Sequence, residues 1–149
     1  ASGGRFVSPH LVKAAAGGSR PEPPRPLGIR PETIAAVKEG MCAVVAEGTG
    51  WRARLQTVAV CGKTGSAQVV SSSRLEKSPN AFEMQPHGWF LAFAPAGDPT
   101  IALAVLVEHG RSGGESAAPV ARQILAHYFG LDRPAAPGAA GVADAEAED

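Results

Sequence analysis

The sequence predicts an α+β fold in which an antiparallel sheet is flanked by helices. Segments with helical periodicity stand toward both ends of the chain, and three strand-like segments lie between them. Only a turn signal, Gly97-Asp98-Pro99, separates the last two strands, and so short a connection makes that pair antiparallel. Helices grouped outside a run of strands are typical of the α+β class.

The N-terminal part of the chain is expected to supply a loop and one helix. Residues 1–16 form a short lead-in, and 17–30 carry four prolines, which keep that loop out of a central sheet. Pro31 opens the first helix, because its missing N–H costs nothing in the first turn. Gly48 is the expected end of this helix. The apolar residues at helical spacing within it are Ile34, Val37, Met41, Val44 and Val45.

Three strands and a second helix follow. The strands are predicted at about 57–70, at 89–94 and at 101–107. Ser116 is the expected N-cap of the last helix, 117–129, which stops at Gly130. The residues that this helix is expected to bury are Val120, Ile124, Leu125 and Tyr128.

The same pattern divides the chain into a folded part and a tail. Residues 1–130 contain all of the predicted helices and strands. Residues 131–149 are rich in Ala, Pro, Gly, Asp and Glu and have almost no large apolar side chains. Such a segment cannot bury enough surface to become ordered, so we expect 131–149 to be disordered.

Composition limits the possible functions. The 149 residues suffice for one sizeable core, and 14 Lys and Arg balance 14 Asp and Glu, so the basic field typical of nucleic-acid binding is missing. No apolar run reaches the roughly 18 residues of a membrane helix. The first residue is alanine, which suggests a processed, cloned or truncated chain.

Residues that often bind metals do not form a metal site in this sequence. The four histidines lie on separate predicted elements, and no two of them stand four residues apart. Cys42 and Cys61 lack metal-ligand spacing and are too few for a disulfide scaffold. We therefore expect two small, buried, hydrophobic cysteines and no metal.

The chemically most informative run is Lys63-Thr64-Gly65-Ser66 on the first predicted strand. One ammonium and two hydroxyls form a compact donor cluster that suits a carboxylate, and Gly65 lets a ligand backbone approach without a Cβ in the way. The Ser66 amide can point at a developing oxyanion, and an unpaired strand edge can hold a peptide as an added strand. A phosphate-binding P-loop is excluded, because Thr57 stands where its first glycine belongs.

This run and its surroundings resemble the transpeptidase domain of class B penicillin-binding proteins, especially the elongation-type members. The resemblance rests on Gly62-Lys63-Thr64-Gly65-Ser66-Ala67-Gln68, followed by the segment 87–95 that contains His-Gly-Trp-Phe-Leu-Ala-Phe-Ala-Pro. It covers about 1–130 in order. The segments 8–12, 38–50, 101–108 and 115–121 support it.

The resemblance implies a partial penicillin-binding, serine β-lactamase-like transpeptidase fold and an acyl-serine enzyme that cross-links peptidoglycan. The run Lys63–Ser66 would bind the substrate or a β-lactam, with the Ser66 amide in the oxyanion hole. Neither the Ser-x-x-Lys nucleophile motif nor a Ser-x-Asn motif precedes Lys63, and Ser78-Pro79-Asn80 follows it as a coincidence. The chain is thus expected to be the C-terminal part of the domain, with no catalytic residue of its own and inactive alone.

Two other functions stay open. One is a non-catalytic β-lactam or peptidoglycan sensor or binding domain of the same superfamily, and the other is a plain interaction module whose Lys-Thr-Gly is accidental. The resemblance implies stem peptides, β-lactams, the upstream part of the same domain and a glycan polymerase as partners, with no cofactor. It also implies an inner-membrane-anchored protein that faces the periplasm or the cell exterior. Without the upstream part, the strand at 101–107 is expected to expose an apolar edge.

Overall fold

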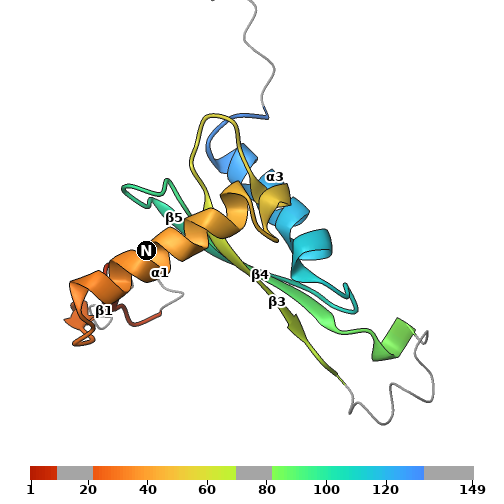
Figure 1. Ribbon diagram of the computed structural model, residues 1–149, viewed down its shortest axis with the longest axis horizontal. Helices are drawn as coiled ribbons and strands as arrows, with labels where there is room; N and C mark the ends of the chain where they lie inside the picture. Colours follow the sequence, from red (N-terminus) through yellow and green to blue (C-terminus); the bar gives the residue numbers. More distant parts are fainter. Residues whose placement is uncertain (10–21, 70–81, 133–149) are drawn as a thin grey trace, which may run out of the picture.

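The structure is a computed structural model that describes residues 1–9, 22–69 and 82–132. Its centre is a three-stranded antiparallel sheet of order β3-β4-β5, formed by β3 (Cys61–Ala67), β4 (His87–Ala94) and β5 (Ile101–Val107). Helix α1 (Pro31–Ala46) precedes this sheet in the chain and α3 (Ala118–Tyr128) follows it (Figure 1). The predicted α+β fold, an antiparallel sheet with flanking helices, is confirmed.

The remaining elements are short. The described part of the proline-rich loop, residues 22–30, contributes only to a two-stranded ribbon and stays out of the central sheet, as predicted. A five-residue π-helical turn leads directly into α3. These elements are β1 (Arg5–Phe6), β2 (Arg25–Pro26), η1 (Trp51–Ala53), η2 (Phe82–Met84) and η3 (Gly113–Ala117).

Helix α3 covers one face of the sheet. Phe90 in the middle of β4 and Leu125 on α3 are both fully buried in the same apolar cluster. Burying a side chain of this size stabilises the fold by roughly 1.5–3 kcal/mol. Three alanines on the sheet-facing side of η3 and α3 let the backbones approach closely: Ala117, Ala118 and Ala121.

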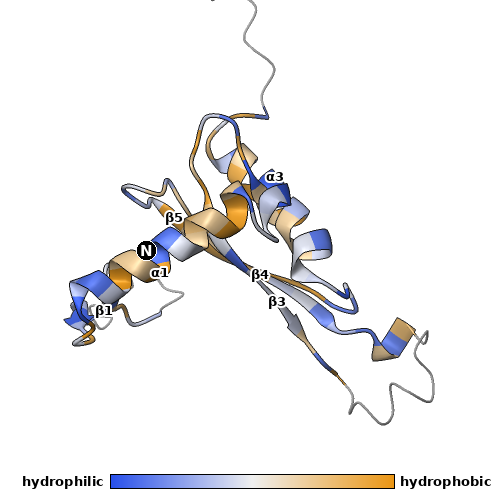
Figure 2. Cartoon of the chain, in the orientation of Figure 1, coloured by the Kyte–Doolittle hydropathy of each residue, from blue (hydrophilic) through white to orange (hydrophobic). Residues whose placement is uncertain are grey.

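Helix α1 runs beside β3. The Lys38 ammonium lies 5.9 Å from the centre of the Phe93 ring, which projects from β4 on the face opposite Phe90. Val45 in the last turn of α1 is 2% exposed and belongs to the cluster around Phe90. Figure 2 shows apolar residues gathered at this end of α1, where the helix approaches the sheet.

The end of α3 matches the sequence prediction. Gly130 has a φ of +70°, a left-handed conformation that favours glycine. Its N–H donates to the His127 carbonyl, and the Leu131 N–H donates to the Ala126 carbonyl at 2.8 Å. This pair of hydrogen bonds is a Schellman motif and satisfies carbonyls that the helix end would leave without partners.

Three local expectations were wrong. The first strand spans Cys61–Ala67 and is shorter than 57–70. Ser116 does not cap α3, because it lies within the π-helical turn, where its hydroxyl donates to the Ser112 carbonyl at 2.8 Å. The predicted buried face of α3 is also misplaced, since Val120, Ile124 and Tyr128 are 40%, 45% and 51% exposed and only Leu125 of the four is buried. The prediction considered only the spacing of large apolar residues. The face of α3 that meets the sheet is instead the one that carries the small alanines.

Within the described ranges, no helix has both the length and the apolar content that crossing a membrane requires.

Candidate functional site

The run Lys63–Ser66 lies on an edge strand. In the described residues β3 pairs only with β4, so its other backbone edge is open to an added strand. All four residues of the run line one groove of about 340 Å³, together with Trp89 and Leu91 of β4. The structure thus brings the four predicted site residues to one concave surface.

Strand alternation divides these residues between two faces. Lys63 stands opposite Leu91 and Gly65 opposite Trp89, and these four residues lie on the open face of the sheet, where all but the half-buried Gly65 are exposed. Thr64 stands opposite Phe90 and therefore projects toward the other face. The sequence-based picture of one compact cluster is too simple, because the ammonium and the hydroxyls border the open edge from opposite sides.

The two polar side chains at the start of the run have partners within the chain. The Lys63 ammonium donates to the Thr64 carbonyl at 2.6 Å. The Thr64 hydroxyl shares a hydrogen bond of 2.8 Å with the hydroxyl of Thr49, which lies in the segment between α1 and η1. Sequence reasoning did not predict that Thr49 lies beside the site. The only signal was a hydroxyl between Gly48 and Gly50, in a segment already matched to the family.

Gly113 in η3 brings a second backbone segment against the site. A Cβ at this position would overlap the carbonyl oxygens of Trp89 and Gly65, so only glycine fits. No pattern in the sequence predicts that the backbone at Gly113 supports β3 and β4. This close packing holds the strand pair from the side of η3.

Two histidines lie close together beyond the groove, near the end of β3. His87 stands opposite Ala67, and its Nδ1 accepts a hydrogen bond of 2.9 Å from the backbone N–H of His109. The two ring centres are 5.0 Å apart. His109 has a φ of +54°, a left-handed conformation that is uncommon outside glycine. The sequence placed these histidines on separate elements, whereas the fold brings them together.

The expectation for the cysteines was wrong. Cys42 on α1 and Cys61, the first residue of β3, form a disulfide across 19 positions of sequence. Cys61 is fully buried, as expected, but its sulfur is bonded and is not a free hydrophobic group. The sequence alone does not show that these two cysteines pair, because they are brought together only by the tertiary contact of α1 with β3.

The histidines and cysteines form no metal centre in the described ranges. No three His, Cys, Asp or Glu residues of these ranges lie close enough together to hold an ion. His10 lies outside the described residues.

Comparison with known proteins gives consistent matches. A family model described as the penicillin binding protein transpeptidase domain matches residues 1–126. The peptidoglycan D,D-transpeptidase MrdA of Haemophilus influenzae is 36% identical over 138 residues, which are 85% of this chain and 21% of that protein. The chain therefore spans about a fifth of the length of this relative.

Solved structures of relatives share the fold. Pseudomonas aeruginosa PBP2, in complex with WCK 5153, is 34% identical with a TM-score of 0.66, over 85% of this chain and 27% of that one. Penicillin-binding protein A of Mycobacterium tuberculosis, solved as a ceftriaxone acyl-enzyme complex, is 28% identical with a TM-score of 0.65. The match covers 83% of this chain and 28% of that chain. The resemblance read from the motifs is therefore confirmed by sequence and by structure.

Proposed function

The chain belongs to the penicillin-binding protein transpeptidase family, and from this premise we propose that it is the C-terminal part of a peptidoglycan D,D-transpeptidase domain. In this proposal residues 1–130 form the domain portion and supply one wall of the substrate cleft. The observation that carries it is the groove on the open edge of β3, where Lys63, Thr64, Gly65 and Ser66 stand side by side.

Each residue of this wall has a chemical role in the proposal. The Lys63 ammonium from one side of the open edge, and the two hydroxyls from the other, bind the carboxylate of a stem peptide or of a β-lactam that lies along this edge. Gly65 leaves room for the ligand backbone, and the free edge of β3 pairs with it as an added strand. The Ser66 amide donates to the oxyanion of the tetrahedral intermediate, a contribution of about 3 kcal/mol in acyl-transfer enzymes.

The nucleophile belongs to sequence outside this chain. No serine of the 149 residues has a lysine three positions later, so the chain contains no Ser-x-x-Lys motif. Acyl transfer needs an activated nucleophile in addition to an oxyanion donor. The chain alone is therefore proposed to bind and polarise a ligand without forming an acyl-enzyme.

Surface exposure supports a missing upstream partner. Val120, Ile124 and Tyr128 form an apolar stripe at helical spacing on α3, and each is 40% or more exposed. On β5, Leu106 is 43% exposed, and in the described residues β5 pairs only with β4. Leu106 projects from the face of the sheet opposite α3, since it stands across from Trp89. An apolar helix face and an open strand edge are both features that isolated domains avoid. We assign both to contact with the upstream part of the same domain.

The proposed location is outside the cytoplasm, on a membrane-anchored parent protein. A disulfide between Cys42 and Cys61 supports this location, because such bonds persist in the periplasm and at the cell surface and are rare in the cytosol. Glycan polymerases are the proposed neighbours of the parent protein, since cross-linking acts on newly made strands.

The test is acylation of the complete protein, with its upstream sequence restored. Fluorescent penicillin is expected to label one serine upstream of Ala1, and a D-Ala-D-Ala stem peptide is expected to release D-Ala when an acceptor amine is present. Labelling without transfer to any acceptor would instead identify a sensor. No labelling at all would contradict the proposal.

A further inference from the structure

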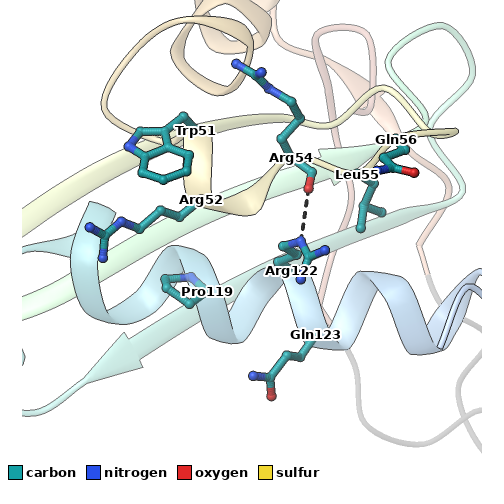
Figure 3. A pocket seen from close by; sticks show the side chains of 8 residues that line it. All are labelled: Trp51, Arg52, Arg54, Leu55, Gln56, Pro119, Arg122 and Gln123. Carbon is teal, nitrogen blue, oxygen red and sulfur yellow. Dashed lines mark hydrogen bonds between the residues drawn. The ribbon is translucent and has the colours of Figure 1, made fainter.

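A second concave surface lies away from β3 and is independent of the proposed function. It is a hollow of about 520 Å³ between η1 and α3, a volume within the usual range of ligand sites (Figure 3). The η1 side contributes Trp51, Arg52 and Arg54, and α3 contributes Pro119, Arg122 and Gln123. We call it the arginine pocket.

Positive charge dominates the arginine pocket. Three arginines line it, and no Asp or Glu is among its lining residues. The Arg54 guanidinium is turned away from Arg122, and its Nε–H donates to the Val45 carbonyl at 3.5 Å. Across the described ranges the one salt bridge joins His127 to Asp132, so these arginines have no carboxylate partner there. Each guanidinium group brings a positive charge and N–H donors but no acceptor, which suits an anionic ligand.

The side chains leave donors available to a ligand. Arg122 uses its Nε–H on the Arg54 carbonyl at 3.1 Å, which leaves its terminal N–H groups for another acceptor. The Arg52 guanidinium lies 5.2 Å from the ring centre of Trp51, which is 56% exposed. Figure 3 shows the Arg52 side chain extending away from Arg122, below the Trp51 ring, and the Arg54 side chain pointing away from Arg122 on the other side. Arg52 and Arg122 are therefore the groups placed to bind carboxylates.

We propose that the arginine pocket binds an acidic peptide segment, and that the occupant is the acidic run 144–149 of the same chain. This run has the sequence Asp-Ala-Glu-Ala-Glu-Asp and carries four carboxylates without a cation. Paired N–H donors of arginine match a carboxylate in geometry as well as charge. The small alanines between the acidic residues leave space beside the exposed Trp51 ring.

The acidic run is close enough to reach the pocket. Ten residues separate Arg122 from Asp132, or about 15 Å at the rise of a helix. Twelve more residues lead from Asp132 to Asp144, and such a length spans up to about 40 Å when extended. The connection is therefore more than twice as long as the return path along α3.

The test uses a fluorescein-labelled octapeptide with the sequence of residues 142–149, titrated by anisotropy into the complete protein. Two versions are compared, one with its native acidic run and one carrying Asp144→Asn, Glu146→Gln, Glu148→Gln and Asp149→Asn. The labelled peptide is expected to bind the neutralised version. In the native version the tethered acidic run competes with the added peptide for the pocket. With an effective concentration of about 1 mM for the tethered run and a Kd of about 100 µM, this competition weakens peptide binding about tenfold.

Two substitutions identify the pocket. Arg52→Gln in the neutralised version is expected to weaken peptide binding about tenfold, because a charge-assisted hydrogen bond pair is lost. Arg122 also donates a hydrogen bond to the Arg54 carbonyl, so replacing Arg122 would disturb packing as well as ligand binding. Arg52→Gln leaves that hydrogen bond in place and therefore tests ligand binding alone. Arg30→Gln, at the start of α1, is the matched control and is expected to change nothing. An uncharged peptide with Asn and Gln at the four acidic positions should not bind.

Three results would overturn the proposal. The first is no binding of the acidic peptide to the neutralised version. The second is equal binding with and without Arg52→Gln. The third is equal binding to the native and neutralised versions, which would assign the pocket to an external acidic partner and remove the acidic run as its occupant.

Discussion

Cys42 and Cys61 join helix α1 covalently to the first residue of β3, two positions before Lys63. The strand that carries the proposed carboxylate-binding run is therefore fixed to the helix beside it at the point where it enters the sheet. The same strand is held on another side by the backbone of Gly113. Both constraints act on a strand whose outer edge is open in the described residues.

Removing the disulfide should destabilise the protein. Cys42→Ser together with Cys61→Ala is expected to lower the free energy of unfolding of the complete protein by about 3 kcal/mol, the typical value for a loop of this length. Urea unfolding with and without a reducing agent measures the effect. The native protein should lose stability on reduction, whereas this double variant should not respond. Peptide mapping without reduction must recover Cys42 linked to Cys61, and two unlinked thiols there would contradict the assignment.

Gly113→Ala should disturb the site through packing. A Cβ at this position meets two backbone oxygens, those of Trp89 and Gly65, and neither can move without shifting its strand. We expect a loss of roughly 1–3 kcal/mol in the free energy of unfolding, as for other overpacked positions. Gly97→Ala is the matched control, because a Cβ there has no neighbour within 4 Å. Equal melting temperatures for the two variants would show that η3 does not pack as described.

Thr49→Val should affect the proposed site without touching the run itself. The substitution preserves the side-chain volume and removes the hydroxyl that shares a hydrogen bond with Thr64. Such a bond contributes about 0.5–1.5 kcal/mol, so acylation of the complete protein by fluorescent penicillin should slow by roughly 2- to 10-fold. Thr57→Val, on an exposed threonine before β3, should leave the rate unchanged. An unchanged rate in Thr49→Val would remove Thr49 from the account.

Ile124 tests whether the upstream part of the domain covers α3. In this chain its side chain is 45% exposed, so Ile124→Ser would cost little stability if that surface met only water. If the upstream part packs there, the substitution should cost the complete protein 2 kcal/mol or more, as expected for a buried isoleucine. Gln123→Ser, at the neighbouring exposed position, is the control. Equal small losses in urea unfolding would place the upstream contact elsewhere.

The fold class followed from sequence because turns and strands carry strong local signals. Gly97-Asp98-Pro99 determines the hairpin of β4 with β5, and Gly130 determines the end of α3 through its positive φ. The buried face of α3 did not follow, because Ala118 and Ala121 meet the sheet through their small size. Large apolar residues such as Ile124 instead lie on the exposed side of the helix, where no described residue covers them.

The site was only partly predictable for a similar reason. The chemistry of the run from Lys63 to Ser66 is local and can be read from residue types. Its support is not local, since Thr49, Gly113 and the disulfide all reach β3 from other segments. The arginine pocket combines residues of η1 and α3, which no spacing in the sequence connects.

The most direct test of the central proposal is the rate at which fluorescent penicillin acylates the complete protein carrying Lys63→Ala. If β3 forms the carboxylate-binding wall of the cleft, loss of this charge-assisted contact should lower the second-order acylation rate about 10- to 100-fold. Lys38→Ala, on α1, should leave the rate within about twofold, since its ammonium lies over Phe93 and outside the groove. An unchanged rate in Lys63→Ala, in a protein that melts normally, would contradict the proposal.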